Sequence, residues 1–227
     1  ADMERLIGTL VREAGKTCAA AVAEVREAVD FLRYYAGQVS ASFDTATHRP
    51  LGPVATISPW NFPLAIFTAQ TAAALAAGNT VLAKPAEQTS LIAAEAVRLL
   101  WEAGIPRAAL QMLPGSGQAL GPLLVDDPRV QAVMFTGSTA VARQLQRSLA
   151  TRLGASGKPI PLVAETGGQN AMIVDSSALA EQAVQDIVQS AFDSAGQRCS
   201  ALRVLYVQHD VADRLIGMLT GAMKELR

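Results

Sequence analysis

Short apolar runs alternate with alanine-rich segments of helical length along most of this sequence, and this alternation constrains the fold more than any other feature. Runs suited to buried strands lie at 54–57, 79–84, 110–113, 130–135, 160–165 and 170–174. Two intervening segments, 64–78 and 90–104, each end in glycine, the residue that commonly terminates a helix. Strands that alternate with helices predict βαβ units, and therefore an α/β fold with a parallel sheet covered on both faces.

The segments at either end of the chain are predicted to be helical. Residues 1–36 repeat apolar positions every three to four residues, at Val22, Val25, Val29 and Leu32. After 174, the pattern predicts a helix at 178–196, a strand at 202–208 and a final helix from 211 onward. Because no capping residue precedes the first helix and the last one runs to the final residue, we expect a piece of a longer protein.

Composition argues against several classes of function. Half of the 227 residues are apolar and the net charge is -1, so one or two globular domains are expected, without the basic surface typical of nucleic-acid binding. No apolar run approaches the roughly 20 residues that span a bilayer, and no signal peptide is evident. Two cysteines form no disulfide framework. We expect a cytoplasmic protein without a metal, in which Cys18 is packed inside a helical region.

A parallel sheet raises the question of a dinucleotide site at the carboxyl ends of its strands, but the usual G-x-G-x-x-G loop is absent. The segment GSGQALG at 115–121 has one residue too many and is equally compatible with a simple turn. The segment GASGKP at 154–159 lacks the earlier glycine of a phosphate loop, and proline follows its lysine. It is therefore predicted to be a surface turn.

Two other turns carry residues suited to a nucleotide. Lys84 follows a predicted strand and Glu87 precedes a predicted helix, so the pair could contact ribose hydroxyls; alternatively, they form a solvated loop pair. In FTGST, Gly137 allows a close backbone approach and Ser138 could bind a phosphate, or could simply cap the next helix.

Three polar residues could serve catalysis. In SPWNFP, two prolines hold the Asn61 amide rigidly, as an oxyanion donor requires, although asparagine is also common in turns. Glu165 precedes Gly167 and Gly168, which leave room for a ligand, although a lone loop glutamate is usually solvated. Cys199, in GQRCS, fits either a small buried residue or a nucleophile.

In their order and spacing these motifs resemble the aldehyde dehydrogenase superfamily. The chain carries PWNFP, then KPAE with Lys84 23 residues after Asn61, then FTGS, E-x-G-G, and GQRC with Cys199 34 residues after Glu165. The stretch 164–208 is most similar to the dehydrogenase module of bacterial bifunctional proline utilisation enzymes. Those enzymes join a flavin-dependent proline dehydrogenase to an L-glutamate-γ-semialdehyde (Δ1-pyrroline-5-carboxylate) dehydrogenase.

The resemblance implies a Rossmann-like NAD-binding domain at 1–165, with incomplete N-terminal helices, and the truncated beginning of a second α/β catalytic domain at 166–227. It implies that Cys199 attacks the aldehyde, that Asn61 holds the oxyanion and that Glu165 activates water. Ser200 and Phe62 are the implied substrate contacts. The implied NAD-binding residues are Ile57, Ser58, Pro59, Trp60, Lys84, Glu87, Gly115, Phe135, Thr136, Gly137, Ser138 and Gly167.

The same resemblance implies NAD rather than NADP, since a carboxylate at Glu87 would repel a 2′-phosphate. FAD is expected only in a proline dehydrogenase domain outside this chain. The parent protein is expected to be a homo-oligomer; its oligomerisation hairpin and a downstream E-x-F-G-P motif are missing from the sequence, so the piece itself would turn over little. Thr166 and Gln169 depart from the usual E-L-G-G-K, and Ala142 replaces a common glycine, but the implied base survives.

Two alternatives remain open. A coenzyme-A-acylating dehydrogenase of the same fold would resolve the thioester with CoA, although such enzymes commonly lack the base that Glu165 provides. A non-catalytic nucleotide-binding or scaffolding module would keep the fold alone, and an unreactive Cys199 would favour it.

Overall fold

The computed structural model describes residues 2–226, and its contacts divide the chain into two compact units, Ala1–Thr166 and Gly167–Arg227. Each unit has its own sheet and its own apolar core. Among the described residues, no helix combines the length and the apolar character that crossing a membrane requires.

The first unit is built on a parallel sheet that has, within residues 2–166, five strands in the order β3-β2-β1-β4-β5. The strands are β1 (Pro53–Ile57), β2 (Thr80–Lys84), β3 (Leu110–Met112), β4 (Ala132–Thr136) and β5 (Leu162–Glu165). Each lies within one of the predicted apolar runs, or extends one residue beyond it. The predicted α/β fold with a parallel sheet is confirmed.

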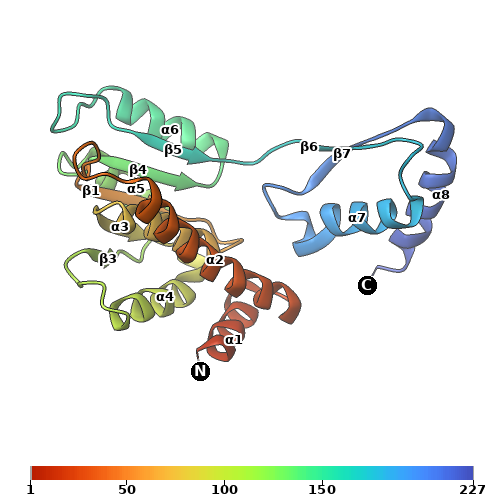
Figure 1. The fold of residues 1–227 in the computed structure, drawn as a ribbon, viewed down its shortest axis with the longest axis horizontal. Coiled ribbons are helices and arrows are strands. Elements are labelled where there is room, and N and C mark those ends of the chain that lie inside the picture. Colours follow the sequence, from red (N-terminus) through yellow and green to blue (C-terminus); the bar gives the residue numbers. More distant parts are fainter. Residues whose placement is uncertain (1, 227) are drawn as a thin grey trace. The chain divides into compact units, whose positions relative to one another are not determined.

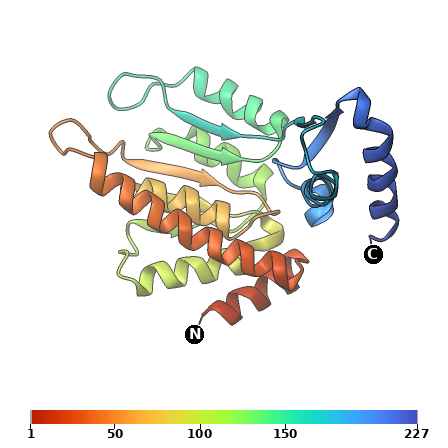
Figure 2. The ribbon, with the colours of Figure 1, turned by 45° about the vertical axis from the view of Figure 1, so that its right-hand side comes forward.

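Helices cover both faces of this sheet (Figure 1). On one face lie α3 (Ala65–Ala76) and α4 (Ser90–Glu102), and on the other lie α5 (Gly117–Asp126) and α6 (Thr139–Ala150); Figure 2 shows the same layers from a second direction. Successive residues of β1 pack in the cores on opposite faces of the sheet, because strand side chains alternate in direction. Val54 joins the core under α3 and α4, and Ala55 joins the core under α5 and α6.

The edge strand β5 differs from its prediction as a buried strand. Val163, Ala164 and Glu165 are exposed, whereas the central strands are mostly buried. An edge strand has a neighbour on one side only, so the covering helices leave much of it in contact with water.

The N-terminal segment, predicted to be helical over 1–36, forms two helices with a short break between them. Helix α1 (Met3–Ala14) ends where Gly15 adopts a left-handed φ of 66°. Helix α2 (Cys18–Ser42) begins after Thr17, whose side chain accepts a hydrogen bond from the Ala20 N–H at 3.2 Å. The buried face of α2 consists of Ala21, Glu24, Val25 and Ala28, whereas the predicted Val29 and Leu32 are exposed.

The second unit contains two parallel strands, β6 (Asn170–Val174) and β7 (Leu202–Val207), with α7 (Ala180–Phe192) and α8 (His209–Lys224). Its core consists of Val174, Val184, Ile187, Leu202 and Leu215. Strand β6 coincides with the predicted run. The helix predicted at 178–196 is shorter, because the short helix η2 (Asp193–Gly196) follows α7 and contains residues with left-handed backbone angles. Helix α8 begins at His209, before its predicted start, and ends at Lys224.

Candidate active site

The carboxyl ends of three neighbouring strands in the first unit border a cleft of about 790 Å³. Strand β1 ends at Ile57, β2 at Lys84 and β4 at Thr136. Because β1 pairs with β2 on one side and with β4 on the other, the strand order reverses at this point. Open parallel sheets bind their ligands at such switch points. The cleft is therefore the candidate nucleotide site.

The cleft brings together residues from three of the predicted motifs. Those that line it are Ile57, Ser58, Lys84, Glu87, Phe135, Gly137 and Ser138. Within the described residues, its lining does not include Pro59, Trp60, Gly115 or Thr136, although each is within three positions of a lining residue. Gly167 belongs to the second unit.

Two helices supply a wall that the sequence interpretation missed. On α5 the lining residues are Gly117, Gln118, Gly121, Pro122, Val125 and Asp126, and on α6 they are Val141, Gln144, Leu145 and Ser148. Both sets repeat every three to four positions, which is the spacing of one helix face. That periodicity is visible in the sequence, but nothing in it says that the face borders a cleft rather than the core.

Lys84 is the most deeply placed charge of the cleft. Its side chain is buried, and Nζ donates a hydrogen bond to the Pro85 carbonyl at 2.8 Å. Burial lowers the pKa of Lys84 below its ordinary value, and the nearby Glu87 carboxylate opposes that shift. One oxygen of Glu87 accepts a hydrogen bond from the Gly117 N–H at 3.0 Å, at the first residue of α5. Lys84 and Glu87, the two residues predicted to hold the ribose, therefore lie between the end of β2 and the start of α5.

Ser58 presents an unsatisfied hydroxyl in the cleft wall. Its backbone N–H donates to the Lys84 carbonyl at 3.1 Å, which fixes the two chain segments together. Its Oγ is buried and has no hydrogen-bond partner among residues 2–226. A buried hydroxyl without a partner costs free energy, so a ligand oxygen or N–H in the cleft would complete the site.

The turn after β4 is held tightly. The Gly137 N–H donates to the Glu165 carbonyl at 3.1 Å, and a Cβ at Gly137 would lie only 2.6 Å from Cζ of the buried Phe135. Ser138 caps α6, because its Oγ accepts a hydrogen bond from the Val141 N–H at 3.3 Å. The simple capping function considered for Ser138 is therefore present, at a helix N-terminus whose dipole also favours an anion.

The segment at 115–121 begins a helix. Gly115 has φ 154°, and the Ser116 side chain accepts a hydrogen bond from the Ala119 N–H at 3.2 Å, which caps α5. The extra residue relative to the usual glycine loop lies between Gly117 and Gly121, within the first turn of α5. Thr136 is fixed separately, since its Oγ1 accepts a hydrogen bond from Gln70 Nε2 at 3.0 Å.

The loop that carries Asn61 and Phe62 rests on a buried ion pair. Lys16 Nζ lies 2.7 Å from Glu24 Oε2 and 3.9 Å from the centroid of the Phe62 ring. Glu24 Oε1 accepts hydrogen bonds from two backbone N–H groups that follow the loop, at 2.8 Å from Leu64 and 3.2 Å from Ala65. Asn61 and Phe62 are half-buried. The start of α3 is thus capped by a carboxylate from α2.

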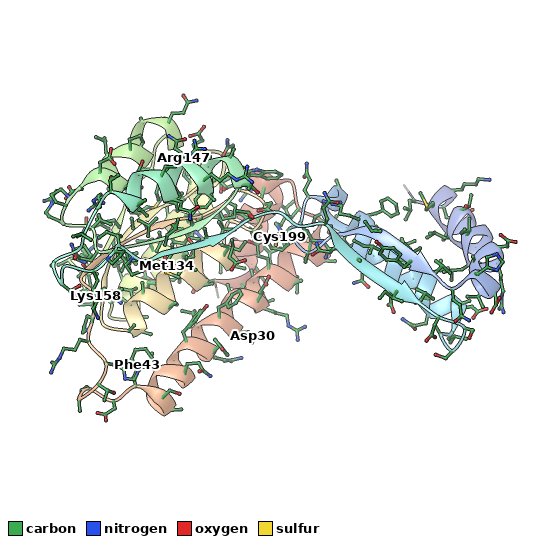
Figure 3. All side chains as sticks on the ribbon, turned by 90° about the horizontal axis from the view of Figure 1, so that it is seen from above. Asp30, Phe43, Met134, Arg147, Lys158 and Cys199 are labelled. Carbon is green, nitrogen blue, oxygen red and sulfur yellow. The ribbon has the colours of Figure 1, made fainter. Side chains whose placement is uncertain are left out.

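The remaining predicted catalytic and substrate residues divide between the two units. Glu165 is the last residue of β5 in the first unit, paired with Thr136. Cys199 and Ser200 are exposed in a turn of the second unit, between η2 and β7, where Figure 3 labels Cys199. Cys18 is also exposed, at the first position of α2, so its expected burial is wrong. A helix N-terminus bordered by a loop leaves such a side chain without neighbours to cover it.

Comparison with known proteins agrees with the motif pattern. The model of the aldehyde dehydrogenase family matches residues 1–227. The bifunctional protein PutA of Salmonella typhimurium is 69% identical over 226 residues, which are 100% of this chain and 17% of that protein. The 1-pyrroline-5-carboxylate dehydrogenase of Anoxybacillus flavithermus is 40% identical over 230 residues, covering 96% of this chain and 45% of that enzyme. The chain therefore spans less than half the length of these relatives.

Solved structures agree with the fold. Proline utilization A of Bradyrhizobium japonicum has a TM-score of 0.90 and 53% identity, over 98% of this chain and 24% of that one. A 1-pyrroline-5-carboxylate dehydrogenase from Thermus, described with bound NAD, has a TM-score of 0.90 and 35% identity, over 99% of this chain and 47% of that one. By the match of its whole length and by its fold, the chain belongs to the aldehyde dehydrogenase family.

Proposed function

We propose that this chain is part of an NAD-dependent L-glutamate-γ-semialdehyde dehydrogenase that acts in proline catabolism. Residues 1–165 form its NAD-binding domain, and 166–227 contribute the nucleophile and the beginning of its catalytic domain. The observation that carries the proposal is the cleft at the switch point of the sheet, lined by Ser58, Lys84 and Glu87. The likeness to PutA and to 1-pyrroline-5-carboxylate dehydrogenases supports the choice of substrate.

The donors around the cleft fit a dinucleotide. Lys84 and Glu87 would hold the adenosine ribose through an ammonium donor and a carboxylate acceptor, and the unsatisfied Ser58 Oγ supplies a further polar contact. The α6 N-terminus at Ser138 would face the pyrophosphate, where partial positive charge stabilises an anion. A side chain at Gly137 would crowd this turn, so glycine keeps it open. The Glu87 carboxylate would disfavour a 2′-phosphate and hence NADP.

The chemistry starts at Cys199. Its thiolate attacks the aldehyde carbon, the C=O π electrons move to oxygen, and a thiohemiacetal oxyanion forms. The Asn61 side-chain amide and the Cys199 backbone N–H donate hydrogen bonds to that oxyanion, and the loss of one such donor typically costs about 10²–10³ in turnover. Bound NAD would supply the hydride acceptor. As the oxyanion electrons re-form the C=O bond, the hydride would leave the former aldehyde carbon and the substrate would remain as a thioester on Cys199.

Glu165 completes the cycle. Its carboxylate takes a proton from water, the hydroxide attacks the thioester carbon, and the C–S bond breaks to release L-glutamate and the Cys199 thiolate. Ser200 and Phe62 contact the substrate in this scheme. The relatives named PutA are described as bifunctional, which supports a second activity elsewhere in the parent protein. We propose that this second activity is a flavin-dependent proline dehydrogenase. We further propose a homo-oligomeric, cytoplasmic parent.

A single-turnover experiment tests the proposal directly. We expect the Glu165→Gln variant of the full-length parent protein, incubated with NAD and glutamate semialdehyde, to form one NADH per chain and to retain an acyl group on the Cys199 peptide in mass spectrometry. The Cys199→Ser variant should form neither. Absence of both NADH and the acyl adduct in wild type and in Glu165→Gln would contradict the proposal. Release of an acyl-CoA in preference to glutamate, when CoA is added to wild type, would identify the acylating alternative.

The proposed contact of Lys84 with NAD can be tested against a matched control variant. We expect calorimetry to show saturable NAD binding by the 227-residue chain and at least about tenfold weaker binding by Lys84→Met, which removes a charge-assisted contact. Arg147→Met removes the same charge from the exposed face of α6, where Figure 3 labels Arg147, and should bind NAD as wild type does. Equal NAD affinity of Lys84→Met and Arg147→Met would show that Lys84 does not bind NAD.

A further inference from the structure

Two backbone hydrogen bonds lie within the turn that carries Cys199. Between η2 and β7, the Gln197 N–H donates to the Ser194 carbonyl at 3.0 Å, and the Ala201 N–H donates to the Arg198 carbonyl at 3.2 Å. Cys199 itself is exposed. A nucleophile on such a turn needs other contacts to fix its direction, because a misplacement of about 1 Å can cost on the order of 100-fold in rate.

Asn170 supplies these contacts from the first residue of β6. Its Nδ2 donates to the Cys199 carbonyl at 2.6 Å and to the Ala201 carbonyl at 3.0 Å. A side-chain amide has two N–H donors on one nitrogen, which matches two acceptors on one turn. The carbonyls on both sides of Ser200 are therefore bound to a single side chain.

The pairing of the strands explains why a side chain has this role. Asn170 pairs with Leu202, but the next pair is Ala171 with Val204, so Arg203 is an extra residue on β7. A bulge of this kind interrupts the ladder and redirects the strand. The Asn170 side chain lies at this irregularity and continues the hydrogen bonding to the two carbonyls that precede β7.

Gly168 keeps the contact open. A Cβ at Gly168 would lie 3.1 Å from Asn170 Oδ1 and 3.4 Å from the Cys199 carbonyl oxygen, whereas one at Gly167 would meet nothing within 4 Å. The second glycine of the pair therefore makes room for the amide and the turn. On the other side of Cys199, Arg198 Nη2 donates to the Gln189 and Ser190 carbonyls at 2.8 and 2.9 Å, which fixes the turn to the end of α7.

We propose that Asn170 is a positioning residue for the nucleophile. By holding the Cys199 carbonyl, Nδ2 fixes the peptide plane and with it the directions of the Cys199 side chain and of the following backbone. The ordering of the turn stands on these contacts alone; its consequence for catalysis rests on the proposed function of Cys199. Neither aldehyde nor NAD contacts Asn170 in this scheme.

Three variants of the 227-residue chain test the proposal. Asn170→Ala removes both donors, Asn170→Asp replaces them with an acceptor that faces two carbonyls, and Gln169→Ala is the matched control at the exposed neighbouring position. Hydrogen exchange should accelerate about tenfold in peptides covering 197–202 of both Asn170 variants, as expected for two lost hydrogen bonds, and should not change in Gln169→Ala. Peptides from α7 and α8 should keep their protection, which separates the effect from unfolding.

The introduced carboxyl gives a signature that a general packing defect would not produce. When pH falls through its titration, the protonated carboxyl of Asn170→Asp regains one O–H donor, so protection of 197–202, corrected for intrinsic exchange, should partly return. Asn170→Ala should show no such recovery. Unchanged exchange at 197–202 in both variants, or equal loss of protection throughout 167–226, would overturn the positioning role.

Alkylation rates distinguish the positioning role of Asn170 from the catalytic assignment of Cys199. In wild type and Gln169→Ala, iodoacetamide should modify Cys199 at least about tenfold faster than the exposed Cys18, as an activated nucleophile requires. In both Asn170 variants that ratio should fall toward one, while the Cys18 rate stays constant. Equal rates for the two cysteines in wild type would count against the catalytic assignment of Cys199, and the exchange result would still decide the ordering of the turn. A high wild-type ratio that the variants leave unchanged would overturn the positioning role.

Discussion

Lys16 Nζ lies 2.7 Å from Glu24 Oε2, and both side chains are almost completely buried. This pair joins the segment after α1 to α2, and through the backbone N–H groups of Leu64 and Ala65 it also reaches the start of α3. The loop carrying Asn61 lies immediately before that start, so its geometry depends on charges far away in the sequence.

Removal of one partner of this pair should be costly. We expect Lys16→Met to lower the free energy of unfolding by about 3–5 kcal/mol, because it leaves a buried carboxylate without its counter-charge. Urea unfolding followed by tryptophan fluorescence measures this, since Trp60 and Trp101 both belong to the first unit. The control is Arg33→Met, which removes an exposed partner of Asp30 and should change stability by no more than about 0.5 kcal/mol. Similar effects of the two changes would contradict the role of the buried pair.

Gly137→Ala should damage the turn after β4. The added methyl group would lie 2.6 Å from Cζ of Phe135, whose ring is buried and has little freedom to move. We expect a loss of about 1–3 kcal/mol of stability, together with weaker NAD binding. Gly121→Ala, on α5, introduces a methyl group that meets nothing within 4 Å and should be neutral or stabilising by about 0.5–1 kcal/mol. A Gly137→Ala protein as stable as Gly121→Ala would show that the turn can relax.

Lys84→Met should stabilise the protein near neutral pH while it weakens NAD binding. Burial lowers the pKa of Lys84, so the folded state holds the proton less tightly than the unfolded state. The charged form therefore costs stability below the folded-state pKa, and this cost disappears as pH rises through that pKa toward the ordinary value of 10.5. The stability difference between variant and wild type, measured by urea unfolding at a series of pH values, should shrink over that window. A variant less stable than wild type at neutral pH would contradict the burial argument.

Glu87→Gln should shift cofactor choice. The amide oxygen can still accept the hydrogen bond from the Gly117 N–H, but the negative charge that repels a 2′-phosphate is gone. We expect the affinity for NADP relative to NAD to rise about tenfold, or about 1.4 kcal/mol, in calorimetric titrations. Glu102→Gln, at the end of α4 in an exposed pair with Arg98, serves as control and should leave the ratio unchanged. If the affinity for NADP relative to NAD did not change in Glu87→Gln, the ribose would not lie beside Glu87.

Two neighbouring positions in η2 should respond in opposite ways to exchange of alanine and glycine. Ala195 has a left-handed φ of 55°, so Ala195→Gly should relieve strain of about 1 kcal/mol and be neutral or stabilising. Gly196 has φ 67°, and a Cβ there would lie 2.8 Å from the Ala191 carbonyl oxygen, so Gly196→Ala should destabilise the second unit by more than about 2 kcal/mol. Hydrogen-exchange protection of α7 and β7 measures the effect of each substitution on stability. Equal protection in the two variants would contradict the backbone angles assigned to η2.

Much of the fold could be predicted because the central strands β1, β2 and β4 are mostly buried and therefore mostly apolar. Strands β2 and β6 lie within the predicted runs, and β1 and β4 each extend one residue beyond theirs. The position of the break between α1 and α2 was not predicted, since the apolar repeat continues across it and the local signals are only Gly15, which ends α1, and Thr17, which caps α2. Hydrophobic periodicity also misassigned the inner face of α2, because Glu24 is buried by pairing with Lys16, which no local pattern reveals.

The candidate site was partly visible for a similar reason. Lys84, Glu87, Gly137 and Ser138 stand directly at strand ends, where a parallel sheet gathers them, so their grouping follows from topology. The α5 and α6 wall was missed, because Val125 and Leu145 have the same spacing whether they face the core or a cleft. The contact of Asn170 with the Cys199 carbonyl depends on a bulge in one strand pair, and sequence spacing does not predict that bulge.

The positions of Cys18 and Cys199 offer a practical measurement. They are the two cysteines of the sequence, each is exposed, and each belongs to a different unit. A spin label can be attached to each of these two cysteines without engineering a labelling site. Pulsed electron resonance would then give the distribution of distances between the units, and its width would report how freely they move.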